Sequence, residues 1–246
     1  PVPDAGRDTS ICFSTTATLN GNGGASYSWN PASSFANPAG RNQVVRPQIT
    51  TTYWLHVEDA NGCRSIRPDS ITVTVLEPVI ADAGADTIIA IGQPLQLEGS
   101  GSGTIFQWTP PAGLSNPSIR NPIALLNNHI TYTLKVTNSA GCSDEDAISI
   151  KVYKGNDIYV ATAFTPNNDG RNDLLLAVPA GIATFKYFKV YNRWGELVFE
   201  TSDFRKGWDG RIKGLPQETG TFIWMAEGID YLGNKIFRKG TTTLMR

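Results

Sequence analysis

An internal repeat limits the folds open to this chain more than any other feature of its 246 residues. Asp4–Ile11 recurs as Asp82–Ile89 at an offset of 78 residues, and Trp29–Pro31 recurs as Trp108–Pro110 at an offset of 79. Similarity at a fixed spacing indicates two copies of one structural unit. We therefore predict two domains of the same fold in the first part of the chain.

The hydrophobic pattern inside each copy alternates with a period of two. In residues 51–57, Tyr53 and two aliphatic side chains fall on one face and Trp54 and His56 on the other, and residues 71–75 alternate strictly. Segments of this length with Gly, Pro and Asn at their ends predict half-buried antiparallel strands. Each copy is therefore predicted to be a small β-sandwich whose mid-domain Trp packs between the sheets.

Three cysteines, Cys12, Cys63 and Cys142, allow at most one intramolecular disulfide. A Cys12–Cys63 bridge would close a loop of about 51 residues, worth about 4 kcal/mol in the chain-entropy model. Ala90 occupies the position of Cys12 in the second copy, which leaves Cys142 without a local partner. We predict that Cys12 and Cys63 are bridged and Cys142 is free, with three buried, reduced thiols in a cytosolic protein as the alternative.

Composition excludes two classes of function. The net charge is −1, divided as −4 over residues 1–153 and +3 over residues 154–246, which is too little for nucleic-acid binding through a basic patch. The longest apolar runs have the length of strands, so the sequence predicts no membrane-spanning segment. The chain opens at Pro1 without a leader, and we expect any export signal to lie upstream.

A different sequence begins after Asp157. Residues 187–191 and 196–200 flank Asn192–Gly195, a four-residue connection ending in Gly, which predicts a hairpin. Residues 222–226 and 241–245 supply further strands. The prediction is an all-β chain of three tandem, immunoglobulin-like β-sandwich domains, at residues 1–78, 79–153 and 154–246.

Two resemblances follow from these motifs. Residues 4–153 resemble the PKD-like and immunoglobulin-like repeats of large bacterial surface proteins, on Asp-Ala-Gly-x-Asp-Thr, Trp-x-Pro, Thr-Tyr-x-Leu-x-Val and Gly-Cys. Further motifs follow residues 163–173: Asn192, Arg193, Trp194 and Gly195, then Gly207, Trp208, Asp209 and Gly210, and finally Lys239, Gly240, Thr241, Thr242, Thr243, Leu244, Met245 and Arg246. On these motifs residues 158–246 resemble the gliding-motility-associated C-terminal domain, a type B sorting domain of the type IX secretion system of Bacteroidota.

The second resemblance implies export from the periplasm across the outer membrane of a Gram-negative bacterium, followed by retention or attachment at the cell surface. It implies as partners the outer-membrane type IX translocon and its shuttle and attachment proteins. The repeats are expected to be spacers or adhesive modules. The alternative is that the repeats recognise a surface polysaccharide or another cell, which aligned, exposed Tyr27 and Trp54 would favour.

One loop suggests a cation. Residues 167–173 place oxygen-bearing side chains around Gly170, and Asn167, Asp169, Asn172 and Asp173 are the candidate Ca²⁺ ligands. The loop is too short for an EF-hand, so an Asx-rich turn that satisfies its own backbone amides is the preferred interpretation. We expect no cofactor, and weak or no Ca²⁺ binding.

The sequence gives little evidence of catalysis. The chain contains none of the hydrolase, zinc-protease, redox or phosphate-loop motifs, and His56 and His129 have no motif around them. A carboxylate pair such as Asp209 with Glu218 or Glu227 depends on its separation in space. Trp208 could stack on a sugar or, as we prefer, close the end of a sandwich. We predict that the chain is not an enzyme.

Overall fold

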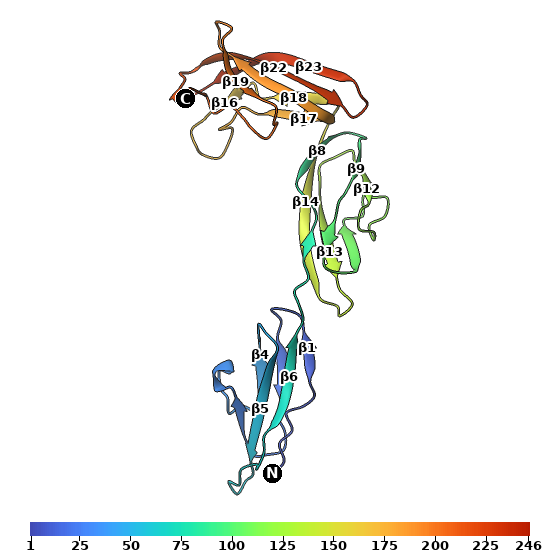
Figure 1. The fold of residues 1–246 in the computed structure, drawn as a ribbon, viewed down its shortest axis with the longest axis vertical. Helices are drawn as coiled ribbons and strands as arrows, with labels where there is room; N and C mark the ends of the chain where they lie inside the picture. The colour runs from blue at the N-terminus through green and yellow to red at the C-terminus, as the bar shows by residue number, and fades with distance from the viewer. The chain divides into compact units, whose positions relative to one another are not determined.

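The computed structural model describes all 246 residues and consists almost entirely of strands (Figure 1). Its single helix is the 3-10 turn η1 (Ala32–Ser34). The chain divides into two compact units, the first formed by Pro1–Ile80, Ser102–Thr104 and Thr137–Asp144 and the second by the remaining residues. The predicted all-β fold class is confirmed, and the division into three domains stays a prediction.

The first copy of the repeat, residues 1–78, contains two sheets. A four-stranded sheet has the order β1-β6-β5-β3, and β2 pairs with β4 in a second sheet. The strands are β1 (Thr9–Ile11), β2 (Ala17–Asn20), β3 (Ser26–Asn30), β4 (Asn42–Val45), β5 (Thr51–Glu58) and β6 (Asp69–Val75). Strand β1 runs parallel to β6, and β6, β5 and β3 are antiparallel neighbours.

The second copy, residues 79–153, repeats this topology. Its main sheet has the order β8-β14-β13-β11, and β9 pairs with β12 while β7 pairs with β10. The strands are β7 (Ala81–Asp82), β8 (Thr87–Ala90), β9 (Pro94–Gln96), β10 (Ser100–Gly101), β11 (Ile105–Thr109), β12 (Ile123–Leu125), β13 (Ile130–Thr137) and β14 (Ser143–Tyr153). Strand β8 is parallel to β14, as β1 is to β6.

The repeated Asp-Ala-Gly-x-Asp motif makes the same hydrogen bond to the last strand in both copies. Its second carboxylate reaches the last strand of its own copy, where Asp8 accepts a hydrogen bond from the backbone N–H of Thr72 at 2.8 Å. In the second copy Asp86 accepts from the N–H of Ser149, also at 2.8 Å. The motif therefore fixes the first strand beside the last one.

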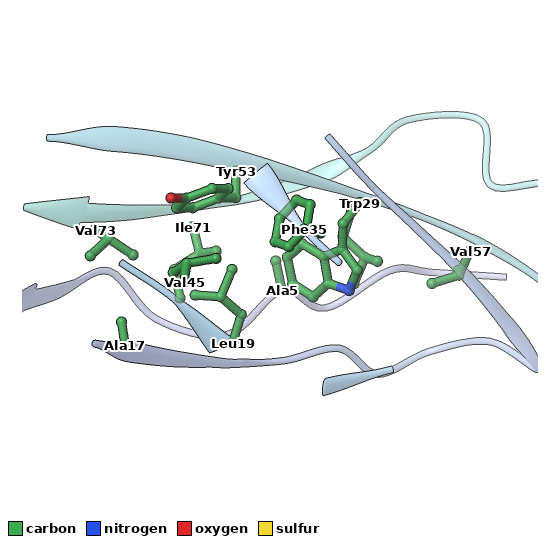
Figure 2. Packing of buried hydrophobic residues seen from close by; sticks show 11 residues of the cluster. Ala5, Ala17, Leu19, Trp29, Phe35, Val45, Tyr53, Val57, Ile71 and Val73 are labelled. Carbon is green, nitrogen blue, oxygen red and sulfur yellow. The ribbon is translucent and has the colours of Figure 1, made fainter. Parts of the chain in front are cut away.

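Buried side chains from both sheets form the core of the first copy (Figure 2). Ala17, Leu19 and Val45 come from β2 and β4, and meet Tyr53 and neighbouring side chains of β5 and β6. The mid-domain Trp29 is fully buried, as is Trp108 in the second copy. Each indole N–H donates to a backbone carbonyl, that of Gly40 or Arg120. The predicted position of the tryptophans is therefore confirmed.

Residues 154–246 form a sheet of five strands in the order β16-β23-β22-β18-β19, with the pairs β15-β17 and β20-β21 beside it. The strands are β15 (Asp157–Val160), β16 (Ala163–Phe164), β17 (Ala177–Ala180), β18 (Ile182–Tyr191), β19 (Leu197–Thr201), β20 (Arg211–Ile212), β21 (Leu215–Pro216), β22 (Gly220–Asp230) and β23 (Lys235–Leu244). The antiparallel pairing of β18 with β19 confirms the predicted hairpin.

The disulfide corrects a prediction. Cys12 is bonded to Cys142, and Cys63 is free and exposed, so the predicted Cys12–Cys63 pairing is wrong. The reason is the parallel pairing of β1 with β6, in which Ile11 lies opposite Val75 at the C-terminal end of β6. Strand β6 begins at Asp69, and Cys63 precedes it. The two ends of this strand are roughly 20 Å apart, so Cys63 lies far from the end beside Cys12. A disulfide requires Cα atoms within about 7 Å.

Candidate functional site

The turn between β18 and β19 is built on Asn192. Its side chain is buried, and its Oδ1 accepts the backbone N–H groups of Trp194 at 3.0 Å and Glu196 at 2.9 Å. Its Nδ2 donates to the Glu196 carboxylate at 3.0 Å, and Gly195 adopts a φ of 82°. These contacts fix the turn from inside, because every polar atom of the amide has a backbone or carboxylate partner.

The same turn presents Arg193 and Trp194 to solvent. Trp194 is 76% exposed, and the Arg193 guanidinium lies 4.3 Å from the centre of its ring. A cation over an indole face is an attractive pair that keeps both groups together. Beside them, residues 217–222 complete a hollow of about 370 Å³ that Asn192, Arg193 and Trp194 also line. A charged and aromatic pair held on a rigid turn, next to a hollow, is suited to contact another protein.

The Gly207–Gly210 motif is structural. Trp208 is 1% exposed, its ring centre lies 5.5 Å from that of Phe164 and 4.6 Å from that of Phe222, and its N–H donates to the Arg211 carbonyl. A buried indole has no face for a sugar. The interpretation of Trp208 as a core residue is therefore confirmed, and the sugar-stacking alternative is wrong.

Most of the final predicted motif, Lys239–Arg246, belongs to β23, which ends at Leu244. Residues 235–244 pair continuously with β22, and Thr243 and Leu244 also pair with β16. Thr242 and Leu244 are almost fully buried. Gly240 faces Trp224 across the ladder, where a Cβ would lie 2.7 Å from the indole. Much of this motif therefore maintains the sheet.

The basic residues of the C-terminal segment have different environments. Arg238 pairs with Asp157 at 2.7 Å, and Lys235 with Glu227 at 3.0 Å. Glu227 also pairs with Lys186, and these two ammonium groups hold its pKa below the ordinary value. The Arg246 guanidinium donates to the backbone carbonyl of Gln217. Three of the four basic side chains in residues 235–246 are therefore held by partners within the chain.

The 167–173 loop uses its carboxylates on its own backbone. Asp173 accepts the N–H groups of Asn168 and Gly170 at 2.6 and 2.8 Å, and Asp169 accepts that of Arg171 at 2.8 Å. Asn167 donates to Asp169 through its side-chain amide. No group of three or more acidic, His or Cys side chains in the structure is placed to hold a metal ion. The expectation of weak or no Ca²⁺ binding stays a prediction.

Both histidines have local partners. The Nδ1 of His129 accepts the backbone N–H of Val152 at 2.8 Å, and the Nδ1 of His56 lies 3.3 Å from the Ser65 hydroxyl. His129 also lines a hollow of about 740 Å³ along β13, β14 and Tyr159. The candidate carboxylates have partners too: Asp209 forms an ion pair with Arg211, and Glu227 with two lysines.

Tyr27 and Trp54 do not form an aromatic line. Tyr27 lies opposite buried Val57 and packs against the core, while Trp54 belongs to the other face of β5 and is 47% exposed. The alternating faces predicted for residues 51–57 are confirmed, since Tyr53, Leu55 and Val57 are all buried. The two aromatic side chains therefore point to opposite faces of one sheet.

These features define a C-terminal β-domain with an exposed Arg193–Trp194 turn. Residues 158–241 match the family model of the CHU_C type IX secretion signal domain, which confirms the sorting domain identified from the sequence. The match gives this part of the chain a C-terminal sorting role in a secreted protein, and implies export and interaction with the secretion machinery. No curated protein matches the chain.

Solved structures with tandem β domains resemble the chain weakly. Sidekick-1 immunoglobulin domains 1–5 are 13% identical, with 99% of this chain and 59% of that one covered and a TM-score of 0.33. The fibronectin(III)-like modules of Clostridium thermocellum CbhA are 8% identical over 60% of this chain and 90% of theirs, with a TM-score of 0.30. Three domains of the bacteriophage RB49 outer capsid protein Hoc are 11% identical over 95% of each chain, with a TM-score of 0.31.

Proposed function

We propose that residues 154–246 direct an attached passenger through the type IX translocon and to the outer surface of a Gram-negative cell. The observation that supports this proposal best is the family match over residues 158–241. The structure contains no helix with the length and apolar character that a membrane span requires. The proposal assigns surface attachment to partner proteins of the outer membrane.

The Arg193–Trp194 turn is the proposed contact point for the export machinery. Of the four sequence motifs that pointed to a sorting domain, this one exposes a large aromatic side chain, whereas Trp208 and Leu244 are buried. A rigid, exposed tryptophan with a stacked arginine combines two of the three residue types that are enriched at energetic centres of protein interfaces. The remaining motif residues support the domain that presents this turn.

The repeats are proposed to be non-catalytic spacers. Tyr27 packs toward the core and Trp54 is exposed on the opposite face, so the aligned aromatic surface expected for a polysaccharide-binding repeat is not formed by this pair. The two copies share one topology and one motif chemistry, which suits a repeated structural unit.

The test uses the full chain fused to a periplasm-targeted fluorescent reporter in a type IX-competent bacterium. We expect reporter signal at the cell surface or in the medium, and its loss in a translocon-deficient strain. Trp194→Ala should reduce the exported signal while the protein stays folded. Leu232→Ala is the matched control, because Leu232 occupies the corresponding position of the β22–β23 turn and is 67% exposed.

The outcomes separate two claims. Failure of the intact fusion to reach the surface would reject the sorting role itself. Export of Trp194→Ala at the wild-type level would reject the Arg193–Trp194 turn as the contact point and leave the sorting role intact. Protease resistance of each variant in periplasmic extracts shows whether the domain is folded.

A further inference from the structure

Cys63 and Cys142 occupy the same position in two equivalent turns. Asp59 Oδ1 accepts the backbone N–H of Cys63 at 2.9 Å, and Asn138 Oδ1 accepts that of Cys142 at 3.0 Å. The cysteine carbonyl accepts a hydrogen bond in turn from the backbone N–H of the same Asp or Asn, at 3.0 and 2.9 Å. The turn before the last strand therefore presents a cysteine in the same way in both copies.

The two cysteines differ in their bonding. Cys142 forms a disulfide with Cys12, which follows the first strand of the preceding copy, and its residue is 4% exposed. Cys63 is exposed and free. In the one bonded case, then, the turn cysteine of a module pairs with the first-strand cysteine of the module before it.

The position of Cys12 in the second copy supports the same rule. That position is Ala90, at the end of β8, and residues 143–246 contain no cysteine. Ala90 is buried, and a Cβ on Gly181 of the C-terminal segment would lie 2.9 Å from the Ala90 Cβ. In both copies, the end of the first strand thus lies close to the segment that follows that copy. This position is a cysteine in the first copy, where the following copy has Cys142, and an alanine in the second copy, where the following segment has no cysteine.

Cys63 lies at the end of the first copy where the chain enters. Val2 passes beside Gly23, on which a Cβ would lie 1.8 Å from the Val2 carbonyl oxygen. Ala25 donates a hydrogen bond to the Glu58 carbonyl at 2.7 Å, just before the turn that carries Cys63. A module joined ahead of Pro1 would therefore meet the Cys63 turn first.

We propose that Cys63 is the acceptor for an intermodule disulfide from an immunoglobulin-like module on the N-terminal side of the first copy, whose first strand is followed by cysteine. The proposal extends beyond the sorting function and does not depend on it. It makes the Cys12–Cys142 bond one link of a head-to-tail series, with Cys63 as the next acceptor and Ala90 as the position where the series ends.

The bond forms by thiol–disulfide exchange with a small disulfide such as oxidised glutathione. The Cys63 thiolate attacks one glutathione sulfur, and a glutathione thiolate leaves. The thiolate of the neighbouring module then attacks Cys63 sulfur in the mixed disulfide and releases the second glutathione. Two cysteines are oxidised, one glutathione disulfide is reduced, and the two cysteine protons end on the two glutathione thiols.

The experiment adds a copy of residues 1–78 ahead of Pro1 of the full chain. The added copy's Cys12 then lies 129 residues before Cys63, close to the separation of 130 for Cys12 and Cys142. The protein is equilibrated in a glutathione redox buffer, alkylated, and mapped by mass spectrometry without reduction. We expect a peptide joining the added Cys12 to Cys63, retention of Cys12–Cys142, and alkylation only at the added copy's Cys63.

Two controls use the same buffer. With Cys12→Ala in the added copy, which reproduces the situation at Ala90, Cys63 should be alkylated as it is in the parent chain. In the parent chain with Cys142→Ala, Cys12 and Cys63 should both be alkylated, because the rule forbids pairing within one module. This second control does not depend on the folding of the added copy.

Three results would overturn the proposal. The first is alkylation of the original Cys63 in the duplicated chain that keeps the added Cys12. The second is a Cys12–Cys63 bond within one copy of the repeat in either protein. The third is a dimer of parent chains through Cys63 while the original Cys63 of the duplicated chain remains unbridged.

Discussion

The indole of Trp224 covers Gly240, its cross-strand partner on β23. A Cβ on Gly240 would lie 2.7 Å from Cζ2 and 2.9 Å from Cε2 of that ring, which is closer than side-chain atoms pack. The ladder on either side is continuous, so neither strand can move away locally without loss of hydrogen bonds. The absence of a side chain at residue 240 is thus what allows the ring to lie against the sheet.

Gly240→Ala should destabilise the C-terminal domain by about 1–3 kcal/mol through overpacking. Hydrogen exchange of peptides from β22 and β23 in the full chain measures the loss. Gly155→Ala is the matched control, because nothing lies within 4 Å of the added Cβ. Combining Gly240→Ala with Trp224→Leu should recover part of the loss, and purely additive effects would contradict the proposed contact.

Trp208→Ala should cost about 3–5 kcal/mol, because it removes a buried ring from between Phe164 and Phe222. Trp194→Ala, which truncates the same residue type at a 76% exposed position, should change stability by only about 0.5 kcal/mol. Calorimetry on the two variants checks both values. Equal losses would mean that Trp194 also supports the fold.

The environment of the Asp230 carboxyl makes the stability of the C-terminal domain depend on pH. Burial would raise the pKa of this carboxyl, but hydrogen bonds from Asn234, Asn156 and Leu232 outweigh burial and lower the pKa below 3.8. The stabilisation is therefore present above the unfolded pKa and is lost as the pH falls through the lower folded value. In Asp230→Asn the unfolding midpoint should depend less on pH below about pH 4.

The Asp230 variant should also be less stable than wild type at neutral pH. Its new amide would place N–H groups toward the side-chain amides of Asn156 and Asn234, which donate to the carboxylate at 3.0 and 3.1 Å. Thermal unfolding of the full chain between about pH 2.5 and 7 measures both effects, since this range spans the titration of the carboxyl. Glu218→Gln, a change at an exposed carboxylate, should show neither, and an unchanged acid profile for Asp230→Asn would refute the assignment.

The Cys12–Cys142 bond should hold the chain together after a single backbone cut between the two cysteines. Ile66 is 97% exposed, and a site-specific protease sequence inserted after it provides the cut. A denaturing gel should show one band without reductant and two with it. The same insertion in a Cys142→Ala chain should give two bands in both lanes, and two bands from the unreduced parent would disprove the bond.

Much of the fold followed from local pattern. The alternation in residues 51–57 correctly placed Tyr53 inside and Trp54 outside, because burial on one face of a strand leaves a period of two in the sequence. The turn at Asn192–Gly195 was found from its Gly and from the flanking strands. The recurrence of its chemistry was missed: Asp59, Asn138 and Asp230 use the same Asx-x-x-Gly turn, with Oδ1 accepting the second and fourth following N–H groups.

Predicting the disulfide pairing correctly requires knowledge of the long-range strand topology. Cys12 and Cys63 belong to one copy of the repeat, and that proximity in sequence favoured the wrong pair. The parallel pairing of β1 with β6 places the end of the first strand far from the turn before the last one. The equivalence of Cys63 and Cys142 was visible in the sequence. The direction of the strands, however, decides which end of its copy each cysteine occupies, and the sequence pattern does not give that direction.

The same bond also determines which parts of the chain bear load. Tension applied between the segment ahead of Cys12 and the C-terminal domain passes through the two sulfur atoms, because Cys12 and Cys142 are covalently joined. The 129 residues between them are bypassed, so both copies of the repeat can lose their folded structure without releasing that length. At about 3.5 Å per residue the withheld extension is roughly 450 Å. Under tension, the two sulfur atoms thus limit how far the repeats can be extended.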